Sequence, residues 1–215
     1  MAQRRDSIRT FTNRSMRPLA PKAEDIAIED VAHALANSCR FTGHVKYFYS
    51  VAQHATLCSY LVEHQAMEEK GDFEGLDVEI AFWALHHDDS EAYLSDIARP
   101  IKNAAAAFGE TYKAVEAQLM EAVKERFLLW PDTPEQVHSV DNTLLVTEAR
   151  DLMHGTDDWS AEYRPNKMPP LPMKIEPWLP ELNRTLFAQV VITEGLIWAK
   201  DRYLRRHYEL EALRG

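Results

Sequence analysis

The stretch Val78-Glu-Ile-Ala-Phe-Trp-Ala-Leu-His-His-Asp88 decides how this 215-residue chain is interpreted. Its apolar residues follow a helical pattern as far as Leu85, and the run then ends on His87 and Asp88. A histidine beside an aspartate on a buried helix face is unfavourable unless another group binds or neutralises the pair. We therefore expect partners for His87 and Asp88 elsewhere in the chain.

Two further ionisable residues lie on apolar helical stripes. His54 follows the helix-start pattern Ser50-Val-Ala-Gln53, and Asp141 lies within the helical pattern that follows Thr133. Taken alone, His54 is explained by a hydrogen bond in the core, and His87 by the dipole at a helix end. Asp141 needs a cation, because a buried carboxylate without one costs on the order of several kcal/mol.

One divalent metal ion, bound by His54, His87, Asp88 and Asp141, explains all of these side chains together. Imidazole and carboxylate ligands suit Zn²⁺, Mn²⁺, Fe²⁺ or Co²⁺ rather than Ca²⁺, and Mg²⁺ stays open as an alternative. Such an ion lowers the pKa of a bound water and polarises a phosphoryl group. The four residues therefore predict a hydrolase.

Two carboxylates beside the predicted ligands are candidates for proton transfer. Glu91 lies four residues after His87 and shares its helix face if the helix continues that far. We expect Glu91 to act as a general acid or base and Asp96 to support it. The alternatives are a solvated glutamate and an aspartate that caps a short helix. His86 and Asp89 are expected to point away, either behind the ligands or to the surface.

Cationic and aromatic residues near the ligands suggest contacts with a substrate. We expect Arg40, Arg99 and Lys102 to bind phosphate. Phe41 and Pro100 are candidates to sandwich a base. The alternatives are a surface arginine at Arg40, a core phenylalanine and an exposed turn proline.

The periodicity predicts an all-α fold, because no strand or hairpin pattern is convincing. Helices are expected at about 28–37, 50–64, 77–88, 104–129, 133–153 and 181–213, with Asp77 and Thr133 as N-caps. Residues 65–76 are expected to form a loop and residues 95–102 a turn. The whole chain is expected to be a single domain with a core at about 25–155, a proline-rich loop at 156–180 and a long C-terminal helix at 181–213.

The composition excludes several classes of protein. The net charge of −10 argues against a nucleic-acid partner, because acidic surfaces repel phosphate backbones. Two cysteines are too few for a disulfide framework, so both are expected to be reduced and buried. No apolar run approaches 18 residues, and the N-terminus lacks a secretory signal. We expect no membrane partner and a cytoplasmic location, in the host cell if the protein is phage-encoded.

The order His54, His87-Asp88, Asp141 resembles the H…HD…D signature of HD-domain phosphohydrolases. The surrounding segments 50–54, 84–92, 96–102 and 141–145 are similar to the bacterial 5'-deoxynucleotidase branch. They are closer still to short phage HD proteins that hydrolyse deoxynucleoside triphosphates, including dATP-specific enzymes. The resemblance covers roughly residues 9–150.

This resemblance implies an HD-domain helical bundle that forms a homo-oligomer and binds a divalent metal ion (Co, Mn, Zn or Mg). It implies metal ligation by the four residues already named, catalysis by Glu91 with support from Asp96, phosphate or sugar contacts from Arg40 and Lys102, and a base contact from Phe41.

The predicted activity is metal-dependent hydrolysis of deoxynucleotides. The preferred reading is a dATP-type triphosphohydrolase that releases deoxynucleoside and triphosphate, because the N-terminal half resembles the phage proteins. The alternative is a 5'-deoxynucleotidase that acts on deoxynucleoside monophosphates. Both reactions cleave at the 5' oxygen, so the catalytic residues do not separate them. A non-catalytic nucleotide-binding HD protein is a second alternative.

Overall fold

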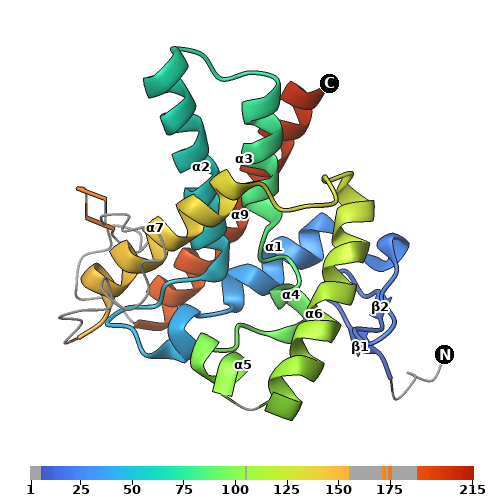
Figure 1. Ribbon diagram of the computed structural model, residues 1–215. Helices are drawn as coiled ribbons and strands as arrows, with labels where there is room; N and C mark the ends of the chain where they lie inside the picture. Colours follow the sequence, from blue (N-terminus) through green and yellow to red (C-terminus); the bar gives the residue numbers. More distant parts are fainter. Residues whose placement is uncertain (1–5, 105, 155–170, 173, 176–187) are drawn as a thin grey trace.

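The computed structural model describes residues 6–104, 106–154, 171–172, 174–175 and 188–215. Within these residues the chain is a helical bundle with one small hairpin near the N-terminus (Figure 1). The all-α class expected from the periodicity is confirmed.

The elements follow one another in a simple order. The helices are α1 (Ile28–Asn37), α2 (Val51–Lys70), α3 (Leu76–His86), α4 (Glu91–Leu94), α5 (Arg99–Ala104), α6 (Ala106–Phe127), α7 (Glu135–Leu152) and α9 (Ala188–Arg214). Two short 3-10 helices are η1 (Ala23–Asp25) and η2 (Arg40–Gly43). The strands β1 (Ile8–Arg9) and β2 (Ser15–Met16) pair antiparallel.

The core lies where α2, α3 and α9 pack together, with α1 against α9 and α7 against α2 and α3 (Figure 1). Fully buried side chains from all of these helices fill it, among them Leu35, Phe82, Leu144, Tyr203 and Leu210. The C-terminal helix α9 is therefore part of the core of the bundle.

The hairpin corrects the expectation that the chain has no strands. Each strand has only two residues, which is too short to show an alternating pattern in the sequence. Its turn is held by the buried carboxylate of Asp30, which accepts hydrogen bonds from the backbone N–H and the hydroxyl of Thr12 at 2.6 and 2.8 Å.

Helix α2 begins as predicted and ends later than predicted. The Ser50 hydroxyl accepts a hydrogen bond from the Gln53 N–H at 3.1 Å, which confirms Ser50 as the N-cap. The helix continues to Lys70 and stops at Gly71, whose φ of 78° suits glycine. The expected loop at 65–76 is therefore mostly helical. Asp77 is not an N-cap, because it lies in the first turn of α3 and accepts hydrogen bonds from Lys70.

Other boundaries also differ from the expectations. Helix α7 is preceded by Pro134, so Thr133 is not its N-cap. The expected turn at 95–102 contains the start of α5. Most of the proline-rich segment 156–180 and the first part of the predicted C-terminal helix lie outside the described residues.

The cysteines are both free thiols, and one differs from the expectation. Cys58 is buried, whereas Cys39 is only half-buried. No helix within the described ranges is both long and apolar enough to span a membrane.

Gly109 allows α5 and α6 to approach closely. A Cβ atom built at this position would lie 2.1 Å from the backbone carbonyl oxygen of Lys102, far inside van der Waals contact. A backbone atom cannot rotate out of the way as a flexible side chain can. Gly109 therefore fixes how α5, which carries Arg99 and Lys102, lies against α6.

The substitution Gly109→Ala tests this contact. In an open helix it would stabilise the protein by about 1 kcal/mol, because alanine is the better helix former. Here we expect a loss of about 1–3 kcal/mol, because the methyl group pushes α5 away. Chemical denaturation measures the sign, and a stabilised variant would contradict the close approach.

Candidate metal centre and active site

The four predicted metal ligands meet at one point in the bundle. His54 comes from α2, Asp141 from α7, and His87 and Asp88 from the turn after α3. His54 Nε2 lies 3.3 Å from Asp141 Oδ1 and 3.8 Å from Asp88 Oδ2. His87 Nε2 lies 3.3 Å from Asp88 Oδ2 and 4.0 Å from Asp141 Oδ1. Two imidazole nitrogens thus face two carboxylates at the separations of ligands around one ion.

The hydrogen bonds of His87 show that these residues fit a cation. Its Nδ1 lies 2.7 Å from the carbonyl oxygen of Ala84, which can only accept, so Nδ1 carries the proton. The other nitrogen, Nε2, is buried and has no hydrogen-bond partner in the described part of the chain. Nε2 therefore faces the carboxylate oxygens of Asp88 and Asp141, an arrangement that suits a metal cation bound between them.

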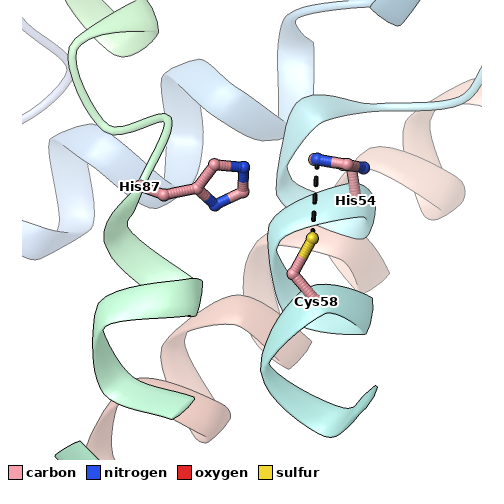
Figure 2. A group of neighbouring side chains, drawn as sticks. All are labelled: His54, Cys58 and His87. Carbon is pink, nitrogen blue, oxygen red and sulfur yellow. Dashed lines mark hydrogen bonds between the residues drawn. The ribbon is translucent and has the colours of Figure 1, made fainter. Parts of the chain in front are cut away.

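The thiol of Cys58 also borders this cluster. Figure 2 shows Cys58 one turn after His54 on α2, with His87 pointing toward both. Cys58 Sγ lies 3.6 Å from His54 Nε2, and the three side chains form a compact group of possible metal ligands. Burial raises the pKa of Cys58 to about 11, so the thiol stays protonated at neutral pH. The carboxylates of Asp88 and Asp141 are the better ligands because they are ionised.

Neighbouring charges account for that ionisation. Burial by itself would raise the pKa of Asp88 and Asp141, but His54, His87 and Arg40 outweigh it and lower both values. A second contact aligns Asp141, because Arg99 Nη2 lies 2.9 Å from its outer oxygen Oδ2. This contact leaves Oδ1 directed at His54.

Glu148 is a site residue that the sequence reasoning missed. It is fully buried on α7 and accepts three hydrogen bonds, from His54 Nδ1 at 2.6 Å, the Tyr49 hydroxyl at 2.8 Å and Arg40 Nε at 3.0 Å. A carboxylate on Nδ1 fixes the tautomer of a ligand histidine and leaves Nε2 free to coordinate. The signal was present, because Glu148 shares the apolar stripe of Asp141, two helical turns later.

Arg40 is buried in ion pairs and is not a surface arginine. Its guanidinium contacts Glu148 and lies 3.5 Å from Asp88 Oδ2. Burial by itself would lower the pKa of Arg40, but Glu148, Asp88 and Asp141 outweigh it and raise the value. The next residues, Phe41 and Thr42, have left-handed φ angles of 55° and 54°. Strained backbone of this kind is common where a side chain must be aimed at a ligand.

A cavity of about 520 Å³ opens beside the cluster. All of the predicted site residues but His54 line its walls. These are Arg40, Phe41, His87, Asp88, Glu91, Asp96, Arg99, Pro100, Lys102 and Asp141. His54 is fully buried behind this wall. The volume is suitable for a small-molecule ligand.

Glu91 lines the cavity, although the helix that carries His86 does not continue to Glu91 as the prediction required. Helix α3 stops at His86, a turn covers residues 87–90, and α4 begins at Glu91. The carboxylate is 7% exposed, and its Oε2 has no hydrogen-bond partner within the described ranges. Burial, followed by the charges of Asp88 and Asp96, raises the pKa of Glu91 well above its ordinary value. Burial also raises the pKa of Asp96.

Of the remaining predicted residues, Lys102 lies 2.8 Å from Glu116 and 3.7 Å from Glu91, and Pro100 is exposed at the cavity. His86 and Asp89 point away from the cluster, as expected. They lie in the fully buried core against α9, so the surface alternative is wrong.

The helical bundle and the converging histidines and aspartates have the character of an HD-domain phosphohydrolase. Residues 16–152 match the family described as 5'-deoxynucleotidase YfbR-like. The chain belongs to this family of metal-dependent HD-domain enzymes, which confirms the resemblance drawn from the sequence.

Two relatives are similar to more than half of the chain. The uncharacterised protein YfdR of Escherichia coli strain K12 is 39% identical over 153 residues, which are 71% of this chain and 75% of that protein. An uncharacterised protein of Rhodobacter capsulatus is 35% identical over 121 residues, which are 55% of this chain and 57% of that protein.

The substitution Glu148→Gln tests the carboxylate behind His54. We expect affinity for Mn²⁺ to fall by roughly 10- to 100-fold, because the amide cannot balance His54 and Arg40 as a carboxylate does. Calorimetric titration of metal-free protein measures this. The control is Glu135→Gln, which changes an exposed glutamate at the start of the same helix. Equal affinities of the two variants would show that Glu148 does not support the site.

Proposed function

We propose that this protein is a metal-dependent 5'-deoxynucleotidase that hydrolyses deoxynucleoside monophosphates to deoxynucleoside and phosphate. The convergence of His54, His87, Asp88 and Asp141 at one point beside the cavity carries the proposal. The family match supports this reaction better than the triphosphohydrolase that the phage-like segments suggested.

The charges around the cavity also favour a monophosphate. Its basic lining residues are Arg40, Arg99, Lys102, Lys113 and Lys124. Its acidic lining residues are Asp88, Glu91, Asp96, Glu116, Glu121 and Asp141. Each of the basic side chains lies within 4.0 Å of a carboxylate. Little positive charge is therefore left for the additional phosphates of a triphosphate.

We assign the metal to His54, His87, Asp88 and Asp141, where it would polarise the phosphoryl group and activate water. Arg40 and Lys102 bind the phosphate oxygens, and Arg99 aligns Asp141. Glu91, protonated through its raised pKa, gives a proton from its carboxyl group to the departing 5' oxygen. The negative charge of Asp96 helps to keep that proton on Glu91.

The base occupies the part of the cavity beside Phe41 and Pro100. Phe41 is half-buried with its ring at the cavity wall, and the guanidinium of Arg40 lies 5.6 Å from the ring centre. An aromatic ring held in this way offers a face on which a base can stack. We also propose a single domain over residues 1–215, a homo-oligomer and a cytoplasmic location.

Product analysis with single substrates tests the reaction. Purified protein is incubated with each dNMP, dNTP and NMP, together with Co²⁺, Mn²⁺, Zn²⁺ or Mg²⁺. We expect inorganic phosphate and deoxynucleoside from the dNMPs. Triphosphate released from a dNTP, with no turnover of any dNMP, would replace the proposal by the triphosphohydrolase. Nucleotide binding without any turnover would favour the non-catalytic alternative.

Removal of the metal tests the centre itself. A chelator should abolish turnover, and an excess of Mn²⁺ should restore it. The variant Asp88→Asn should stay below about 1% of wild-type turnover at saturating Mn²⁺, because it loses an anionic ligand. Asp132→Asn, an exposed change outside the cavity, serves as the control. Wild-type turnover in Asp88→Asn would mean that the reaction centre lies elsewhere.

A further inference from the structure

Behind the metal centre, a chain of buried polar side chains joins α3 to α9. His86 Nδ1 lies 2.6 Å from Asp89 Oδ2, and His86 Nε2 lies 3.0 Å from His207 Nδ1. The Tyr203 hydroxyl donates a hydrogen bond to Asp89 Oδ1 and lies 3.2 Å from His86 Nδ1. His86, Asp89 and Tyr203 have no exposed surface, and His207 is 3% exposed.

The hydrogen bonds in this chain join its members in one continuous order. The Tyr203 hydroxyl donates to Asp89. His86 lies between Asp89 and His207, with one ring nitrogen at hydrogen-bond distance from each. Burial, followed by His86 and Arg126, lowers the pKa of His207 to about 3. Each side chain thus fixes the orientation of the next.

The position of this chain in the sequence connects it to the metal centre. His86 and Asp89 bracket His87 and Asp88, and the Asp89 N–H donates to the His86 carbonyl oxygen at 3.2 Å across the same turn. Anchoring the outer two side chains in the core therefore sets the direction of the inner two. The anchors Tyr203 and His207 lie on α9, outside the family match at 16–152.

We propose that Tyr203 and His207 are positioning residues that hold the turn 86–89 so that His87 and Asp88 present their ligand atoms to the metal. The inference rests on the proposed function only in assigning the metal to His87 and Asp88. Neither Tyr203 nor His207 lines the cavity, so both act through the turn.

A purely stabilising contact would not need this arrangement. Apolar side chains of similar volume would pack α9 on α3 at least as well, because buried polar groups lose their hydration. Directional hydrogen bonds add a fixed orientation, which matters where two ligand atoms must be held accurately.

The test compares Tyr203→Phe with Tyr208→Phe. Each removes one hydroxyl from α9, but Tyr208 is half-exposed and lies outside the chain of hydrogen bonds. We measure the Mn²⁺ dissociation constant of metal-free protein by calorimetry, the thermal midpoint in chelator, and kcat and KM at saturating dNMP. Tyr203→Phe should weaken Mn²⁺ binding by roughly tenfold and lower kcat more than it changes KM. Tyr208→Phe should match the wild type.

A lower thermal midpoint with an unchanged Mn²⁺ dissociation constant would overturn the proposal, because the hydroxyl would then only stabilise the fold. A second pair covers the case in which Tyr203→Phe does not fold. His207→Asn keeps a polar group that can hydrogen-bond near the position of Nδ1 and should retain Mn²⁺ affinity, whereas His207→Leu should lose it. Equal affinities of these two variants would also overturn the proposal.

The metal titration separates this inference from the proposed function. If the wild type binds Mn²⁺ but hydrolyses no nucleotide, the proposed function fails. The Mn²⁺ dissociation constants of the variants still test the positioning role in that case.

Discussion

The site depends on the balance of buried charge around Glu148. This carboxylate has no exposed surface, and burying it without partners would cost on the order of several kcal/mol. It is therefore met by Arg40, Tyr49 and His54, which all come from the segment 40–54. One buried anion thus fixes the η2 turn and α2 against α7, and sets which nitrogen of His54 faces Asp88 and Asp141.

The metal centre extends this balance toward solvent. Asp88 and Asp141 add negative charge beside Glu148, and Arg40 alone does not neutralise all three. A divalent ion bound at this cluster would supply the missing positive charge, in agreement with the metal-dependent family to which the chain belongs. The buried carboxylates need positive partners for the bundle to be stable, and the same carboxylates form the candidate metal site.

The sequence was most informative where a polar residue interrupts an apolar helical pattern, because such a residue is costly unless it has a partner. This reasoning found His54, His87, Asp88 and Asp141, and applied to Glu148 it would have found that residue too. The sequence was less informative about where helices begin and end. Pro100 suggested a turn, but proline is tolerated in the first turn of a helix, and α5 begins there. Helix α2 is longer than predicted, because its charged last turn ends in the ion pair of Lys70 with Asp77.

By itself, the sequence determined the helical class and the family, and it singled out the four side chains that the structure brings together, because helical periodicity and residue chemistry are local properties. Only the tertiary structure decided that Arg40 pairs with Glu148, 108 residues away, and that His86 and Asp89 turn inward to meet α9. Periodicity gives the face on which a side chain lies. The partner that it meets depends on how whole helices pack, which is set by the shape of the entire core.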